Sequence, residues 1–371
     1  MRYSHAMKIG FVVNPIAGMG GSVALKGTDG EAILAEAESR GAARTSPLRA
    51  ARAMSGLVGR SDIEVLTCSG DMGVDELEDA GLPSSVIYQA SAPTRGEDTT
   101  KAARAFVNAG AAILVFAGGD GTARDVLAAI DQRVPMIGIP AGVKMHSAVF
   151  VNAPEDLPLL LSEFMRSGAT KDAEVMDIDE EGFRAGVLRA RLFGYAKVPD
   201  DSVHLQAGKE EYHSGGADEE AVEIGQYVAD EMEDGVAYIL GPGTTTARVA
   251  DAMGQEKTLL GVDVYIDKKR VLRDATEEDL MDFLRTGRKA RIVVTPIGAQ
   301  GFFLGRGNQQ LSARVIRAVG ARNVLVLAGP TKLKGTPVLH ADTGDPELDI
   351  SFKGRIKVIS GYKRRRMVSV L

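Results

Sequence analysis

The chain has 371 residues, of which 44% are hydrophobic, and a net charge of −6 at pH 7. It is long enough for two domains, or for one large domain, with a substantial apolar core. The sequence has no dominant basic block, and the basic run at 362–366 is short. This charge distribution gives no electrostatic case for binding nucleic acid or an anionic membrane surface.

Two further features bear on where the protein works. Cys68 is the one cysteine, so an internal disulfide and a cysteine metal cluster are excluded, and a reducing cytoplasm is the expected location. No apolar run reaches the roughly 18–20 residues that a membrane-spanning helix needs, and the N-terminus has no apolar signal region. We therefore expect no membrane partner.

The first part of the chain alternates apolar runs with amphipathic ones. Strands are predicted at 8–13, 63–68, 85–89, 111–117 and 135–139, and helices at 29–40, 46–57, 73–80, 97–109 and 123–130. Such alternation predicts a parallel α/β sheet of the Rossmann type. We assign residues 7–150 to this N-terminal α/β domain.

The remaining chain, 151–371, is expected to form a second, mixed α/β domain with a cleft between the two. Runs at 174–178 and 184–198 have little helix between them and predict a β-rich, hairpin-like insert. Alternation then resumes, with strands predicted at 236–240, 259–266, 291–295 and 323–328. The last strands, near 338–344 and 355–360, are candidates for returning to the first domain.

Three glycine-bearing loops follow strands of the first domain, after Val13, Ala117 and Ile139. In a parallel sheet the carboxyl ends of the strands lie on the same edge, where ligands bind. We therefore expect the three loops to converge. Asn14 opens the first loop, and Lys144 and His146 lie in the third, where Lys144 is a candidate to neutralise phosphate and His146 a candidate donor to a ligand.

The loop after the strand at 111–117 reads Gly118-Gly119-Asp120-Gly121-Thr122 and leads into a helix. Its glycines allow a bulky anion to approach the backbone, and the helix start offers unbonded N–H groups. A carboxylate in such a loop would repel phosphate and needs another role. Asp120 could accept a proton from an attacking hydroxyl, help to hold a metal, or cap the helix.

The second domain has two loops of the same kind. Gly243, Thr244 and Thr245 stand at a strand–helix junction and offer hydroxyls and backbone N–H groups to phosphate oxygens. No lysine follows these glycines, so this is not a Walker loop. The long loop at 298–310 contains Arg306 and Asn308 as candidate ligand contacts, since a loop of this length is costly to order for structure alone.

An acidic cluster near the end of the chain is the remaining candidate site. Asp342 and Asp345 could hold a hard cation through their carboxylates, although acidic turn residues around Gly344 are the commoner explanation. The sequence has no grouping of histidine and cysteine that suggests a zinc site. The simplest metal requirement is Mg²⁺ bound together with a nucleoside triphosphate.

The loops in their order resemble a known superfamily. The resemblance is carried by Asn14-Pro15, Gly118-Gly119-Asp120-Gly121-Thr122, Pro140-Ala141-Gly142, Gly241-Pro242-Gly243-Thr244-Thr245 and Gly305-Arg306-Gly307-Asn308. Together these stretches are similar to the NAD kinases and the diacylglycerol or sphingosine kinases. Within that superfamily they look like the ATP–NAD kinase-like, AcoX-type branch.

This resemblance implies transfer of the terminal phosphate of ATP, with Mg²⁺, to a hydroxyl acceptor. In NAD kinases the acceptor is the adenosine ribose 2′-hydroxyl of NAD. Asp120 matches the catalytic aspartate of the superfamily, and Gly118, Gly119, Gly121 and Thr122 match its phosphate-contacting loop. A homodimer or homotetramer is also implied.

The acceptor stays open at the level of sequence. The second motif reads Gly-Pro-Gly-Thr-Thr in place of the common Thr-Gly-Ser-Thr, and no equivalent of the Asn-Glu pair of NAD kinases is found. One alternative is a kinase of another small hydroxyl metabolite or nucleoside. Another, of a different class, is a nucleotide sensor without catalysis.

Overall fold

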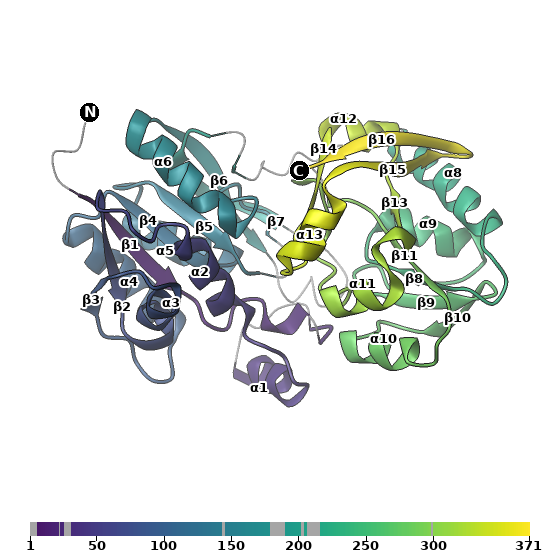
Figure 1. Cartoon of the computed structure of the whole chain (residues 1–371), viewed down its shortest axis with the longest axis horizontal. Helices are drawn as coiled ribbons and strands as arrows, with labels where there is room; N and C mark the ends of the chain where they lie inside the picture. Colours follow the sequence, from purple (N-terminus) through teal and green to yellow (C-terminus); the bar gives the residue numbers. More distant parts are fainter. Residues whose placement is uncertain are drawn as a thin grey trace. The chain divides into compact units, whose positions relative to one another are not determined.

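The computed structural model describes residues 6–21, 23–25, 31–142, 145–178, 190–201, 204–205, 216–297 and 300–371 (Figure 1). The chain forms two compact units. The first comprises Met1–Met19, Gly27–Glu38 and Ala43–Gly208, and the second comprises Gly20–Lys26, Ser39–Ala42 and Lys209–Leu371. The first unit thus extends beyond residue 150, to Gly208.

The first unit is built on a parallel five-stranded sheet in the order β3-β2-β1-β4-β5. The strands are β1 (Met7–Val13), β2 (Ile63–Cys68), β3 (Ser85–Tyr88), β4 (Ile113–Gly118) and β5 (Met136–Pro140). Strand β4, between β1 and β5, is buried along its whole length, as its continuous apolar run predicts for a strand covered on both faces.

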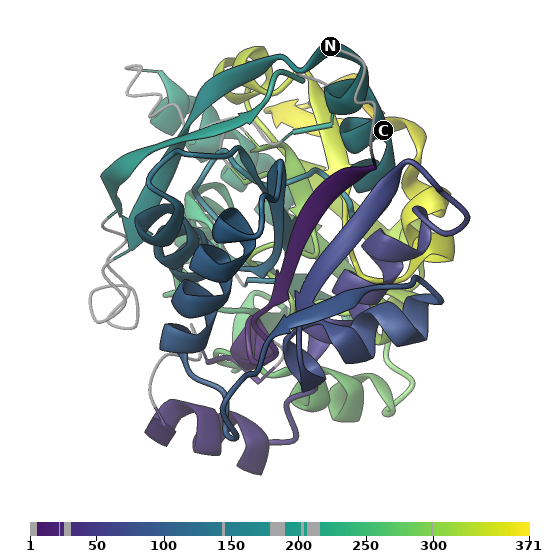
Figure 2. The same ribbon diagram turned by 90° about the vertical axis from the view of Figure 1, so that its left-hand side faces the viewer.

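Helices cover both faces of this sheet (Figure 2). They are α2 (Thr45–Ser55), α3 (Val74–Ala80), α4 (Gly96–Asn108), α5 (Asp120–Ile130) and α6 (Leu157–Ser167), whereas α1 (Glu31–Ser39) lies apart from the sheet in Figure 2. Helix α2 contacts α3 and α6, whereas α4 contacts α5. These two groups bury the apolar side chains of β1 and β4 in a single core. The predicted parallel α/β fold is confirmed for this part of the chain.

A two-stranded antiparallel hairpin completes the first unit. It consists of β6 (Thr170–Ile178) and β7 (Ala190–Pro199), and β6 packs on α5. This is the β-rich insert that the sequence predicts. The part of the expected second strand at 184–189 lies outside the described residues.

The second unit contains a mixed nine-stranded sheet in the order β10-β9-β8-β11-β13-β15-β16-β14-β12. Its middle strands β8 (Ala237–Leu240), β11 (Ala290–Val294), β13 (Val324–Leu327) and β15 (Gly354–Gly361) run parallel to one another. The outer strands are β9 (Asp263–Ile266), β10 (Lys269–Leu272), β12 (Phe302–Leu304), β14 (Val338–Ala341) and β16 (Arg364–Val370). The last strands therefore pair within the second sheet and do not return to the first.

The helices of the second unit are α8 (Ala217–Asp230), α9 (Thr244–Ala252), α10 (Glu277–Leu284), α11 (Ala313–Val319), α12 (Pro330–Gly335) and α13 (Pro346–Phe352). Short elements such as β10, β12, α12 and α13 are absent from the sequence prediction. They have three to seven residues, too few for a helical or alternating period to be recognised. Nowhere in the described part of the chain is a helix both long and apolar enough to cross a membrane.

The centre of the first core is packed against a glycine. A Cβ on Gly138, in β5, would lie 2.3 Å from Cδ1 of Phe150 and 2.8 Å from Cζ of Phe116. The two rings meet edge to face with centroids 5.5 Å apart. Because the rings occupy the volume that a side chain would need, glycine is required at this position.

We expect Gly138→Ala to lower the free energy of unfolding by about 1–3 kcal/mol, since the methyl group overpacks the core. Gly96→Ala is the matched control, because a Cβ there meets its nearest neighbour at an ordinary 3.4 Å. Urea denaturation of both variants measures the difference. Equal stability of the two variants would contradict the packing argument.

Glu76, in the first turn of α3, is a buried acid of the first unit. Its side chain is 3% exposed, and its Oε2 has no hydrogen-bond partner among the described residues. Burial raises the pKa of Glu76 to about 7, with a smaller contribution from neighbouring aspartates. The native state thus favours the protonated acid over the ionised one.

A pH dependence of stability follows for Glu76. Its native pKa lies above its ordinary value of 4.5, so ionisation costs stability as pH rises through the interval between these values. We expect Glu76→Gln to be more stable than the wild type at pH 8 and closer to it at pH 5. Thermal denaturation at both pH values tests this, and a difference independent of pH would contradict it.

Candidate functional site

The central feature of the first unit is the tight junction between β4 and α5. Strand β4 ends at Gly118, Gly119 is the N-cap, and α5 begins at Asp120. A Cβ on Gly118 would lie 2.4 Å from Oγ1 of Thr122. The first glycine of the motif is therefore needed for the helix to start directly above the strand.

The carboxylate of Asp120 is fixed by the backbone of the loop that follows β5. Oδ2 accepts a hydrogen bond from the N–H of His146 at 2.7 Å, and Oδ1 accepts one from the N–H of Ser147 at 2.9 Å. Asp120 is buried. Burial raises its pKa to about 6, while hydrogen bonds from Ser147 and His146 oppose the rise.

The loop after β1 is tied to the same junction through Asn14. Its Nδ2 donates to Oγ1 of Thr122 at 3.0 Å, and its backbone N–H donates to the carbonyl of Ala117 at 2.9 Å. Its Oδ1 accepts from the N–H of Ile16 at 3.3 Å, which closes a local turn. The first loop is thereby held against the start of α5.

The three loops converge, as the sequence predicts. The N–H of Ala141 donates to the carbonyl of Gly118 at 2.9 Å. A Cβ on Gly142 would lie 3.0 Å from Cα of Gly119, and one on Gly18 only 1.8 Å from the carbonyl oxygen of Ala141. Backbone thus packs on backbone where the loops meet, and only glycine allows this approach.

The loop after β5 contains two further predicted residues, His146 and Lys144. His146 is buried, and its backbone, through the bond to Asp120, has a clear place in the site. Ser147 has the same place but is missing from the sequence prediction, since an isolated serine after a glycine loop carries no signal. Lys144 lies outside the described residues.

In the second unit, Gly243, Thr244 and Thr245 form the predicted strand–helix junction. Gly243 is the N-cap of α9 with φ 128°, and the helix begins at Thr244. The hydroxyl of Thr246 donates to the carbonyls of Gly241 at 2.7 Å and Gly243 at 2.9 Å. An α-helix has no internal acceptor for the N–H groups of its first turn.

Arg306 and Asn308 occupy structural positions in their loop. Nε of Arg306 pairs with Oδ2 of Asp342 at 3.1 Å, and its guanidinium lies 3.7 Å from the ring centroid of Phe302. Asn308 accepts from the N–H of Gly305 at 2.8 Å and donates to the carbonyl of Phe303 at 2.9 Å. Both side chains are buried, so these contacts favour ordering of the loop as their role.

The two candidate metal ligands are also engaged by the protein. Asp342 is buried in the ion pair with Arg306. Asp345 accepts from the N–H of Leu348 as the N-cap of α13 and pairs with Arg317 at 2.7 Å. Across the residues that the structure describes, no group of three or more His, Cys, Asp or Glu side chains is arranged to hold a metal ion.

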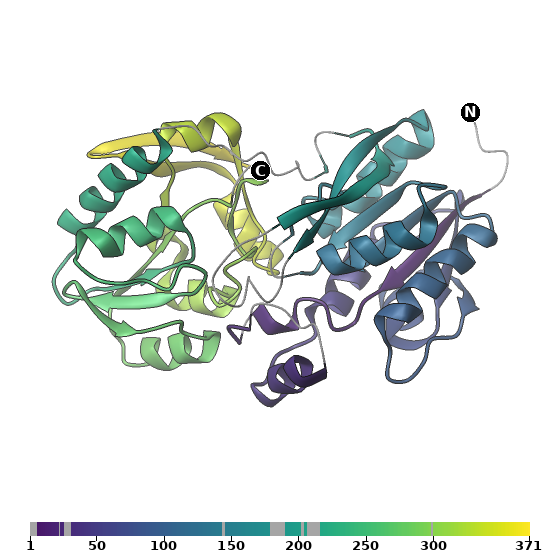
Figure 3. The same ribbon diagram turned by 180° about the vertical axis from the view of Figure 1, so that it is seen from behind.

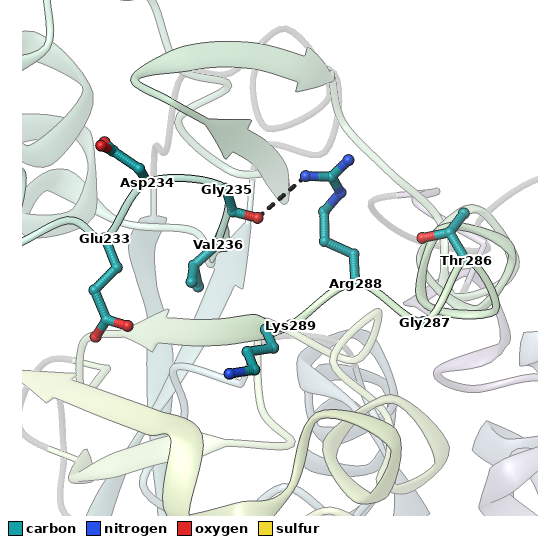
Figure 4. Close-up of a pocket in the computed structure, with 8 residues that line it drawn as sticks. All are labelled: Glu233, Asp234, Gly235, Val236, Thr286, Gly287, Arg288 and Lys289. Carbon is teal, nitrogen blue, oxygen red and sulfur yellow. Dashed lines mark hydrogen bonds between the residues drawn. The ribbon is translucent and has the colours of Figure 1, made fainter.

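A pocket of about 480 Å³ lies elsewhere in the second unit (Figure 4). Its lining comes from residues 233–236, which precede β8, and 286–289, which precede β11. Arg288 donates to the carbonyl of Gly235 across it at 3.1 Å. The pocket therefore opens at the amino ends of the parallel strands, opposite the edge that carries the glycine loops, where ligands of α/β sheets bind.

Comparison with known proteins follows the same division of the chain. Residues 9–169 match the family described as the ATP-NAD kinase N-terminal domain, and residues 233–370 match the ATP-NAD kinase C-terminal domain. A search of curated proteins finds no significant match.

Among solved structures, the chain is similar to a candidate diacylglycerol kinase from Bacillus anthracis str. Sterne, at 14% identity and a TM-score of 0.24. This match covers 48% of the present chain and 47% of that protein, so the chain spans about half of its length.

The two family matches follow each other in the order of the family's domains and together span most of the chain. The first contains the junction built around Asp120, and the second contains the junction at the start of α9. The chain thus carries an N-terminal and a C-terminal domain of the ATP-NAD kinase family.

Proposed function

We propose that the protein transfers the terminal phosphate of ATP to the adenosine ribose 2′-hydroxyl of NAD, with Asp120 as the base. The observation that carries the proposal is the buried carboxylate of Asp120, held by two backbone N–H groups at the start of α5. The family indicates phosphorylation of NAD or a related substrate. NAD is the member of that class that we propose.

The hydrogen bonding and the pKa of Asp120 are suited to a general base. An ionised carboxylate has about four lone-pair positions. The N–H groups of His146 and Ser147 use one on each oxygen, and the Ser147 side chain supplies a further hydrogen bond. With a pKa of about 6, the carboxylate is mostly ionised at pH 7 but retains appreciable proton affinity. A positioned base of this kind contributes about 10²–10⁴ to the rate.

The surrounding backbone suits a phosphate. The N–H groups at the start of α5 carry the positive end of the helix dipole, which stabilises the charge of a transferring phosphoryl group. Gly121 has open space beside its Cα, since a Cβ there meets no atom within 4 Å. We assign Gly118, Gly119, Gly121 and Thr122 to phosphate contact, together with Asn14, which orients Thr122.

Several finer points belong to the proposal. Gly243, Thr244 and Thr245 are proposed to bind nucleotide in the second unit, and Lys144 and His146 to contact it in the first. Mg²⁺ is proposed to accompany ATP on its phosphates. The contacts of Asp342 and Asp345 give no fit for a protein-held ion, so neither is assigned as its ligand. Membership of the AcoX-type branch, a cytoplasmic location and a homodimer or homotetramer remain predictions.

A kinase of another small hydroxyl compound is the second candidate. The observation that favours it is the Gly-Pro-Gly-Thr-Thr sequence at the start of α9, which departs from the common pattern of NAD kinases. A nucleotide sensor would keep the same loops without turnover. Product analysis separates the three functions.

The direct test is incubation of the protein with ATP, Mg²⁺ and NAD, followed by assay of NADP. We expect NADP to form, and Asp120→Asn to lower kcat by about 10²–10⁴ because the amide cannot take up the proton. Asp125→Asn, five residues further along α5, is the control and keeps near-wild-type turnover. Full activity of Asp120→Asn would remove the base assignment. Product on another hydroxyl compound, but not on NAD, would favour the second candidate.

The pH dependence of the rate tests the same carboxylate. Below pH about 6 the base becomes protonated, so kcat/KM is expected to fall roughly tenfold per pH unit. Ser147→Ala removes hydrogen bonding that lowers the pKa of Asp120, which moves this acidic limb to higher pH. Ser162→Ala, an exposed serine on α6, leaves it in place. A limb that stays fixed in Ser147→Ala would show that another group titrates.

A further inference from the structure

Three neighbouring parallel strands of the second sheet end at one edge. Strands β8, β11 and β13 are adjacent and parallel, and they end at Leu240, Val294 and Leu327. The loops that follow contain Gly243, Thr295 and the start of α12. Parallel strands bring their carboxyl ends together at the edge where α/β sheets bind ligands.

Lys332, on α12, reaches this edge from the third loop. Its Nζ donates to Oγ1 of Thr295 at 2.9 Å. Among the described residues no carboxylate lies within ion-pair distance of Nζ, and burial alone lowers the pKa of Lys332 to about 8. An ammonium has three donors, and a hydroxyl takes up one of them without neutralising its charge. A partly buried cation of this kind is costly without an anion beside it.

A carboxylate close to α12, that of Glu220, forms its hydrogen bonds with Thr331 and not with Lys332. Glu220, on α8, accepts from the N–H of Thr331 at 3.0 Å and from its hydroxyl at 2.9 Å. A Cβ on Gly329 would lie 2.2 Å from Oε2 of Glu220, so this glycine lets the acid approach. Glu220 caps α12 and fixes the helix, and Lys332 is left as the uncompensated charge.

The start of α9 lies beside Thr295. A Cβ on Gly243 would be 2.7 Å from Cγ2 of Thr295, so these two loops are in contact. Helix α9 has no side-chain cap and no acidic residue in its first turn. Thr245 is 6% exposed, and its hydroxyl has no hydrogen bond recorded within the described part of the chain. Polar donors and a cation thus gather at this edge without a protein anion.

Helix α9, which begins at this edge, is packed on α8. Helices α8 and α9 lie side by side (Figure 3), and a Cβ on Gly225 would lie 2.4 Å from the carbonyl oxygen of Arg248. The helix that carries Glu220 is therefore packed directly on the helix that begins at Thr244. Helix α8 thus contacts both α9 and α12, the two helices that begin at this edge.

We propose that Lys332, with Thr245 and the N–H groups at the start of α9, binds a phosphate group of a nucleotide. The inference rests on the proposed function, because either ATP or NAD could supply this phosphate. The shared chemistry is a diphosphate whose negative charge neutralises the ammonium. Lys332 binds this group as a ligand contact, and the proton-accepting step stays with Asp120.

The experiment measures the Kd of pyrophosphate by calorimetry for the wild type and three variants. Lys332→Met is expected to raise Kd about tenfold or more, because a charged hydrogen bond is lost. Lys332→Arg keeps the charge and is expected to retain binding within a few-fold. Lys334→Met, an exposed lysine on the same helix, is the matched control and leaves Kd unchanged. Parallel titrations with ATP and NAD show which of them loses affinity and so supplies the phosphate.

A second measurement on the wild type covers the case in which Lys332→Met fails to fold. Acylation by acetic anhydride at pH 8, followed by peptide mass spectrometry, is expected to be slowed at Lys332 by saturating pyrophosphate, and unchanged at Lys334. Equal acylation of Lys332 with and without pyrophosphate, or an unchanged Kd in folded Lys332→Met, overturns the inference.

The two proposals can fail separately. Protection of Lys332 by pyrophosphate in a protein that forms no NADP supports this phosphate site and removes the proposed function. NADP formation by a protein whose Lys332 is never protected does the reverse.

Discussion

The organisation of the first unit depends on one buried carboxylate. Asp120 begins α5, yet its partners, the N–H groups of His146 and Ser147, come from the loop after β5. A buried anion without hydrogen-bond donors would be strongly destabilising. Backbone N–H groups can supply these donors without a second buried charge. The requirement to satisfy Asp120 therefore fixes the loop after β5 against the start of α5. Asn14 fixes the loop after β1 to the same point through Thr122.

Each unit contains a buried charged side chain whose recorded hydrogen bonds are with neutral groups. In each, a charged side chain lies at the carboxyl edge of parallel strands and is bonded to neutral donors or acceptors. Asp120 accepts from backbone N–H groups, and Lys332 donates to the hydroxyl of Thr295. Burial moves both pKa values toward neutrality, to about 6 and about 8. Groups with such shifts concentrate at functional sites, and the proposals for both residues rest on their hydrogen-bond geometry.

Glycine-rich loops in this chain have two different physical reasons. At the convergence in the first unit, glycines let loops from separate strands meet around Asp120. In the loop that contains Arg306, a Cβ on Gly305 would lie 1.7 Å from the carbonyl oxygen of Asp342. There the glycine allows packing of one chain segment on another, and Arg306 and Asn308 hold the loop from inside. Composition is the same in both cases, and only the neighbours distinguish them.

The sequence by itself determined the alternation of strands and helices, the parallel first sheet, the hairpin insert and the junction at Asp120. These are local signals, because an apolar run, a glycine turn and a helix start lie within about twenty residues of one another. The short elements β10, β12, α12 and α13 were decided by tertiary packing, since their few residues have no readable period. The partners of Asp120 lie 26 and 27 positions away, and Thr295 and Lys332 are separated by 37. Contacts of this kind form only when the sheets bring strand ends together, so the chemical environment of both charges was decided by the tertiary structure.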